Sequence, residues 1–122
     1  MANFGSTQVV TFAAGAKTLV KINQDLYSSE YYLRESLVEY NMRIRHSQTK
    51  SADGLVVNDR HNVEVTQTTF AVANVSPEVT VKAYFVFEAP AAFIAVTPMS
   101  GLCSWAIATS NEALTNLLGW QS

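Results

Sequence analysis

The sequence predicts an α+β protein, in which an N-terminal β-hairpin and an antiparallel meander sheet are followed by two C-terminal helices. Apolar and polar residues alternate along several segments between Thr7 and Glu88, with the period of two that is typical of strands. From Thr97 onward the apolar residues recur with the helical period of about 3.6. Because the strands all precede the helices, the order favours an α+β plan over alternating βαβ units.

The composition describes one small domain that is poor in charge. The chain has 122 residues, which we interpret as a single domain over residues 1–122. Only 15% of the residues are charged, against about 25% in an ordinary soluble domain, so we expect an oligomer that buries more surface than a monomer can. The formal net charge is -2, which creates no overall basic field for nucleic acid. Any RNA-binding residues must therefore gather on one face.

The first strands are placed by alternation and by the turns between them. Thr7–Ala13 and Lys17–Asn23 form a predicted hairpin, with Gly15 marking the turn. The next segment, Asp25–Arg34, is ambiguous, and its three tyrosines suggest a short strand between loops.

Three longer strands are predicted next, each with one apolar and one polar side. A turn at Asp53-Gly54 and a loop over Ala73–Glu78 separate them. The strands are Leu37–Ser47, Arg60–Val72 and Val79–Glu88. The apolar side of the first carries Val38, Tyr40, Met42 and Ile44. The apolar side of the last carries Val79, Val81, Ala83, Phe85 and Phe87.

Two short helices are predicted to end the chain. Thr97-Pro98 is typical of an N-cap followed by proline in the first turn. Thr109 and Glu112 fit a capping box that begins a second helix, and Gly119 occupies the place of a left-handed residue just beyond its end. Helices this short are marginal in water, so both are expected to pack on another surface.

Residues for catalysis or metal binding are scarce. No phosphate-binding loop, nucleophile elbow or zinc-protease motif is present. The histidines His46 and His61 have no carboxylate cluster near them, and Cys103 lies on an apolar helical side, where we interpret it as a small buried hydrophobe. We therefore expect no metal, no cofactor and no small-molecule substrate. The charge-free run Ala89–Asn111 is interrupted by proline, glycine and hydroxyl residues, so no membrane span is expected either.

The strongest functional signal is a polar face shared by the three longer strands. Arginine and lysine can bind phosphates, asparagine and threonine can contact base edges, and tyrosine can stack on a base. The residues of these types on this face are Asn41, Arg43, Arg45, Arg60, Asn62, Thr66, Thr68, Lys82 and Tyr84. RNA binding is one interpretation. The other is an ordinary solvated face on which Glu39, Glu64 and Glu88 pair with the basic groups.

The order of elements resembles the coat proteins of single-stranded RNA bacteriophages, of the levivirus type. The likeness extends over nearly the whole chain and is one of architecture and pattern. The segments that carry it are Leu37–Ser47, Arg60–Val65, Val79–Phe87, the closing helix Asn111–Gly119 and the opening Met1-Ala2-Asn3.

The resemblance implies a structural protein whose first partner is a second copy of itself. Subunits of the family dimerise with their sheets edge to edge, and the helices of each chain cover the sheet of the other. The dimers assemble into an icosahedral shell around single-stranded genomic RNA, and in many members a dimer also binds an RNA hairpin and represses translation. The resemblance therefore implies a virion protein that is assembled in the cytoplasm of a bacterial host.

The family's RNA contacts can be carried over by position. Asn41, Arg43, Arg45 and Ser47 correspond to the inward strand that contacts RNA, and Lys82 and Tyr84 fall on the last strand, where the family has a stacking tyrosine. Arg60, Asn62 and Thr66 join them only in one register, because a shift by one residue would expose His61, Val63 and Val65 instead. The loop Ala73–Glu78 contains no cysteine, so the inter-subunit disulfides of some members are not expected.

Two other functions stay open from the sequence. The first is a small dimeric RNA-binding regulatory protein of similar architecture that forms no shell. The second is a small enzyme with a site built from Cys103 and a histidine, whose thiolate would have to be accessible and low in pKa.

Overall fold

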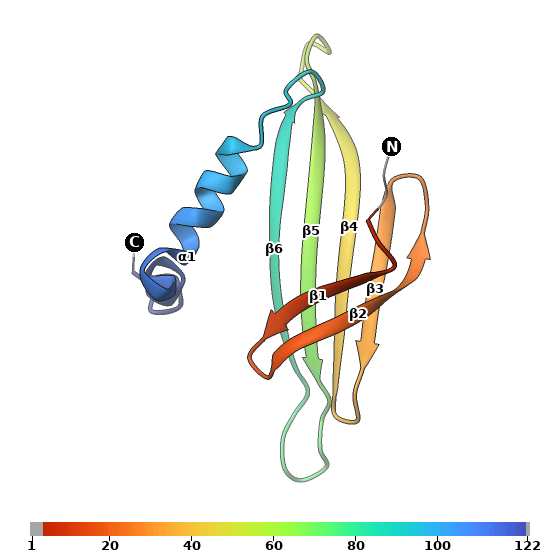
Figure 1. Ribbon diagram of the computed structural model, residues 1–122, viewed down its shortest axis with the longest axis vertical. Coiled ribbons are helices and arrows are strands. Elements are labelled where there is room, and N and C mark those ends of the chain that lie inside the picture. Colours follow the sequence, from red (N-terminus) through yellow and green to blue (C-terminus); the bar gives the residue numbers. More distant parts are fainter. Residues whose placement is uncertain (1–3, 122) are drawn as a thin grey trace. The chain divides into compact units, whose positions relative to one another are not determined.

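A computed structural model describes residues 4–121, so the Met1-Ala2-Asn3 opening lies outside the described residues. The chain divides into two compact units, Met1–Pro90 and Ala91–Ser122 (Figure 1). The first unit holds six strands: β1 (Thr7–Phe12), β2 (Gly15–Gln24), β3 (Ser28–Arg34), β4 (Val38–Lys50), β5 (Val57–Thr69) and β6 (Val79–Pro90). The second holds the helix α1 (Thr97–Leu118).

The strands form one antiparallel meander in which each strand pairs with the next along the chain. The order β1-β2-β3-β4-β5-β6 leaves β1 and β6 as the two edges. The ladder between β4 and β5 runs from Val38 opposite Thr69 to Lys50 opposite Val57, and β6 continues it on the far side of β5. This uninterrupted register fixes which side chains share a face.

The turn between β1 and β2 differs from the predicted one. Gly15, predicted to mark the turn, is the first residue of β2 and pairs with Phe12. Its φ of 119° belongs to a backbone region that glycine enters without steric cost. In the view of Figure 1, β1 and β2 pass in front of β4 and β5. β2 pairs with β3, with a register irregularity between Lys21 and Asn23.

The core lies where β2 covers β3 and β4. The buried residues Leu19, Tyr31, Tyr40 and Ile44 form one cluster, and Met42 and Val63 are among the partly buried residues packed against it. The predicted apolar side of β4 is therefore the side that faces the core. The hydroxyl of Tyr31 donates a hydrogen bond of 2.7 Å to the Gly5 carbonyl, which anchors the segment that enters β1.

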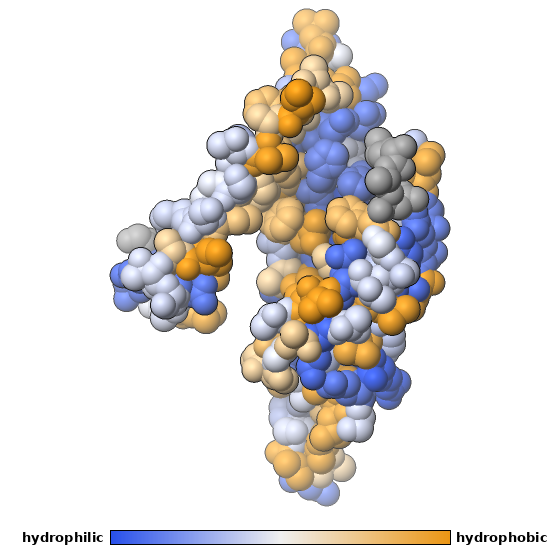
Figure 2. Space-filling model, viewed as in Figure 1, coloured by the Kyte–Doolittle hydropathy of each residue, from blue (hydrophilic) through white to orange (hydrophobic). Residues whose placement is uncertain are grey.

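The apolar side of β6 stays open to solvent in the single chain. Val79, Val81 and Phe85 are all substantially exposed, although the register places them on the same side of the sheet as Tyr40 and Ile44. Figure 2 shows hydrophobic residues interspersed with hydrophilic ones over the side of the sheet that β1 and β2 cross. Exposed apolar patches of this kind mark surfaces that bind other molecules.

The prediction of two separate helices is not confirmed, because α1 is one element with a kink inside it. The backbone leaves helical geometry from Ala108 to Asn111, and φ is positive at Thr109, Ser110 and Asn111. A left-handed conformation costs roughly 1–2 kcal/mol for each residue that carries a Cβ. The kink coincides with the position of the expected capping box.

The ends of α1 are displaced by one residue from the predicted ends. The N-cap is Val96 and makes no side-chain hydrogen bond, while Thr97 already belongs to the helix. At the other end Gly119 has a φ of -85°, and the left-handed residue is Trp120. The Trp120 amide donates to the Leu117 carbonyl. No helix in the described part of the chain is long and apolar enough to cross a membrane.

The core predicts a contrast between two neighbouring residues of β2. Leu19→Ala should lower the free energy of unfolding by about 2–5 kcal/mol, because Leu19 is fully buried against Tyr31 and Tyr40. Val20→Ala, on the exposed side of the same strand, should change it by less than about 0.5 kcal/mol. Denaturant unfolding at a fixed protein concentration measures both, and equal effects would show that β2 does not close the core.

Candidate nucleic-acid interface

The strand register brings all nine predicted RNA-binding residues to one face, which we call the polar face. Directly opposite residues of an antiparallel ladder project to the same side. The nine fall into four rows across the strands: Ser47 beside Arg60; Arg45 beside Asn62; Arg43 beside Glu64 and Tyr84; and Asn41 beside Thr66 and Lys82. The polar face lies on the other side of the sheet from the core.

The same register removes the ambiguity on β5. Asn41 pairs with Thr66 and Arg45 with Asn62. His61, Val63 and Val65 consequently lie on the core side. Thr68 also belongs to the polar face, since it pairs with Glu39.

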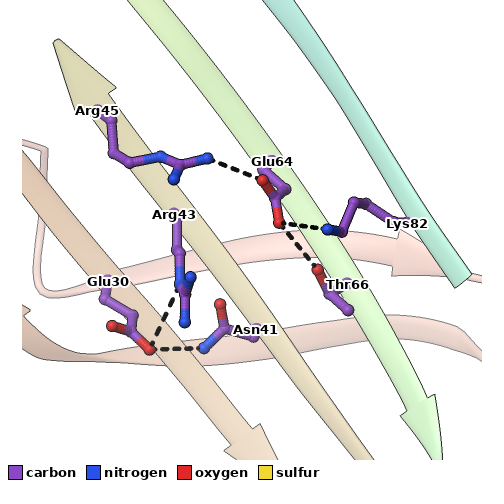
Figure 3. Close-up of polar contacts among 7 residues, drawn as sticks. All are labelled: Glu30, Asn41, Arg43, Arg45, Glu64, Thr66 and Lys82. Atoms are coloured by element: carbon purple, nitrogen blue, oxygen red, sulfur yellow. Dashed lines mark hydrogen bonds and ion pairs between the residues drawn. The ribbon is translucent and has the colours of Figure 1, made fainter. Parts of the chain in front are cut away.

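Glu64 is the centre of the ion pairs on the polar face (Figure 3). Its Oε2 accepts a hydrogen bond of 2.8 Å from Arg45 Nη2, and its Oε1 lies 3.6 Å from Lys82 Nζ. Thr66 Oγ1 donates to the same Oε1 at 3.5 Å. One carboxylate from β5 thus joins a cation on β4 to a cation on β6.

Glu30 of β3 contacts two other side chains of the polar face. Its Oε1 accepts a hydrogen bond of 2.8 Å from Asn41 Nδ2 and lies 3.9 Å from Arg43 Nε (Figure 3). Sequence reasoning missed Glu30, Tyr32 and Arg34, because Asp25–Arg34 was ambiguous as a strand. Their even spacing was the available signal, and pairing of β3 with β4 places them on the polar face.

The remaining glutamates of the face bind hydroxyl groups. Tyr32 donates a hydrogen bond of 2.6 Å to Glu39, and this bond to a carboxylate raises the pKa of the tyrosine. Glu88 accepts a bond of 2.8 Å from Thr49. Of the three glutamates expected to pair with basic groups, only Glu64 does so among the described residues. None of the ion pairs in residues 4–121 involves Arg60.

Two hollows open on this side of the sheet. One, of about 270 Å³, is lined by Asn41, Arg43, Thr66 and Lys82 among other residues. The other, of about 620 Å³, brings Arg45, Ser47, Arg60 and Asn62 together with the turn 25–28. In that turn the Tyr27 amide and the Ser28 hydroxyl and amide donate hydrogen bonds to the carboxylate of Asp25. These bonds lower the pKa of Asp25, which keeps an anion at the rim.

The residues named from the sequence for a metal or a catalytic site are His46, His61 and Cys103. In the described residues no group of three or more histidine, cysteine, aspartate and glutamate side chains could hold a metal ion. Cys103 is exposed, so its expected burial is wrong for the single chain, and its Sγ lies 3.9 Å from the Sδ of Met99. His46 and His61 face each other across β4 and β5, with their Nδ1 atoms 2.8 Å apart.

Residues 5–90, which span all six strands and the whole polar face, match the sequence profile of a family described as the phage phiCb5 coat protein. The chain belongs to this family of coat proteins. The resemblance that the sequence pattern predicted is thereby confirmed, and the protein is a structural component of a bacteriophage capsid.

Solved structures show the same fold at low sequence identity. The coat protein is similar to the bacteriophage EMS014 coat protein, with a TM-score of 0.60 and 17% identity over 85% of this chain and 72% of that one. The virus-like particle of Beihai levi-like virus 21 gives a TM-score of 0.59 and 14% identity over 93% and 91% of the two chains.

A third structure is an unassembled virus coat protein dimer, titled a bacteriophage RNA-binding dimer. It gives a TM-score of 0.54 and 11% identity over 95% of this chain and 94% of that one. No curated protein sequence matches the chain.

Proposed function

We propose that this coat protein acts as a single domain that dimerises, assembles into an icosahedral shell and packages single-stranded genomic RNA on its polar face. Assembly takes place in the cytoplasm of the bacterial host. The observation that carries the proposal is the register of β4, β5 and β6, which separates the nine predicted RNA contacts from the core and from the apolar side of β6. One side of the sheet is thus left for RNA and the other for protein.

The chemistry of the polar face suits RNA in three ways. Arg43 and Arg45 are two residues apart on β4, so their Cα atoms are about 6.5–7 Å apart along the strand, close to the phosphate spacing of a nucleic-acid backbone. Tyr84 is 65% exposed and offers an aromatic surface on which a base can stack. Asn41 and Asn62 supply amides for base edges. Binding of an RNA hairpin, with repression of translation, would use the same groups.

The edge strand β6 supports dimerisation. It spans Val79–Pro90, pairs with β5 on one side and has no strand on the other in residues 4–121. A long edge with free amides and carbonyls is a template for another chain, and pairing with β6 of a second copy would satisfy them. The apolar residues exposed on α1, such as Trp105, Ile107 and Leu117, would then cover the partner's apolar strands.

Replacing the arginine pair tests RNA binding. Arg43→Gln with Arg45→Gln should lower the slope of log affinity for single-stranded RNA against log salt concentration by roughly 0.7 to 1.4, because a full phosphate contact contributes about 0.7 and Arg45 is shared with Glu64. Both side chains are about half exposed, so the fold should survive, as circular dichroism would verify.

A double variant with the same change of charge serves as the control. Lys21→Gln with Lys50→Gln removes two positive charges outside the polar face and should leave the slope near that of the parent. An unchanged slope in the arginine variant, or an equal loss in both variants, would contradict the assignment of Arg43 and Arg45.

The proposed stacking of a base on Tyr84 predicts a different effect on RNA binding from that of the arginines. Tyr84→Ala should weaken RNA binding by about 1–3 kcal/mol through lost stacking, with little change in the salt slope, because the side chain carries no charge. Tyr84→Phe keeps the ring and should bind as the parent does. Binding curves over a range of salt concentrations separate the two effects, and an alanine variant with parental affinity would remove Tyr84 from the interface.

Two adjacent positions on β6 test the dimer. Val81→Lys places a charge on the side that the partner is proposed to cover, where burial of an unpaired charge is costly, so the dimer should be lost. Thr80→Lys adds the same charge on the polar face and should leave the dimer intact. Light scattering after size-exclusion chromatography measures the mass, and a dimeric Val81→Lys variant would contradict this arrangement.

A further inference from the structure

Two of the four cations that are proposed to bind RNA, Arg45 and Lys82, already pair with Glu64. We propose that Glu64 is an internal competitor of RNA phosphate, which limits how tightly the polar face holds RNA. This inference rests on the proposed packaging function and deepens it.

The first support is the depth at which the groups lie. The side chain of Glu64 is only 15% exposed, whereas those of Arg45 and Lys82 are 47% and 51% exposed. An RNA phosphate arriving from solvent therefore meets the two more exposed cations first, and the less exposed carboxylate lies between them (Figure 3). The phosphate must either take over bonds made to Glu64 or share the cations with it.

The second support is the electrostatics of that exchange. Glu64 makes a 2.8 Å charge-assisted bond to Arg45 and an ion pair of 3.6 Å to Lys82. A phosphate that binds both cations gains less than it would from free ones, because it displaces existing pairs and meets a like charge close to them. The affinity for RNA, and the slope of log affinity against log salt concentration, should both be smaller than the number of basic residues suggests.

The third support is that the other glutamates of the polar face make weaker contacts with cations than Glu64 does, or none. Glu30 is 3.9 Å from Arg43 Nε and bonds mainly to Asn41. Glu39 accepts a bond from Tyr32 and takes part in none of the ion pairs within residues 4–121. Glu39→Gln therefore removes the same charge from the same face without releasing a cation, which makes it the matched control for Glu64→Gln.

The test compares these two variants with the parent in binding to a fluorescent oligouridylate over a range of salt concentrations. Size-exclusion chromatography verifies that all three proteins have the same oligomeric state. Glu64→Gln should bind about three- to tenfold more tightly, the effect of relieving two partly exposed ion pairs. Its salt slope should be steeper by up to roughly 1.4 as two cations become available. Glu39→Gln should change the affinity by less than about twofold, with no change of slope, since it releases no ion pair.

A second background shows whether Glu64 acts through its two partners. In a protein that carries Arg45→Gln and Lys82→Gln, adding Glu64→Gln should give no further gain in affinity. A gain that persists there, equal gains from both glutamate variants, or weaker binding by Glu64→Gln would each overturn the competitor role. A parent that binds no oligouridylate at any salt concentration would instead overturn the proposed packaging function, and the competitor role with it.

Discussion

Pairing of β4, β5 and β6 in one uninterrupted antiparallel register is the constraint on which the rest of the coat protein depends. Because side chains alternate across a strand, this register sends Tyr40 and Ile44 into the core and Arg43 and Arg45 to the opposite face. A shift by one residue on β5 would place Val63 on the polar face and carry Asn62 to the core side. The ladder therefore fixes the core, the ion pairs of Glu64 and the proposed RNA contacts together.

Alternation made the long strands and their two faces predictable from the sequence, because a period of two persists over many residues and needs no knowledge of the partner strand. The same argument placed the proposed RNA contacts of β4 and β6 on one face, whereas those of β5 joined them in only one of two registers, which the strand pairing decided. It did not find Glu30, whose strand is short and lies within an ambiguous run of tyrosines. Local capping signals located the irregularity in α1 near Thr109 but not its form, a kink inside one element. The burial expected for Cys103 is wrong in the single chain, because helix surfaces that the sequence marks as apolar are open there.

The low charge of the chain has two separate physical consequences in the structure. It leaves apolar residues exposed on the core side of β6 and, in the second unit, on α1, and such surfaces are stabilised when another chain covers them. On the polar face several of the few cations are paired with glutamates. The positive electrostatic field of that face therefore acts only over a short range. In the proposed function, self-association covers the exposed apolar surfaces, and the hold on RNA rests on many modest contacts. Both properties suit a capsid subunit that acts in numerous copies.

A cryo-electron microscopy reconstruction of particles purified from expressing bacteria tests the central claim most directly. The account predicts closed shells in which two subunits meet along β6, with the polar face of β4 to β6 directed inward against density for nucleic acid. Shells in which this face points outward, or in which internal nucleic-acid density does not contact it, would contradict the account.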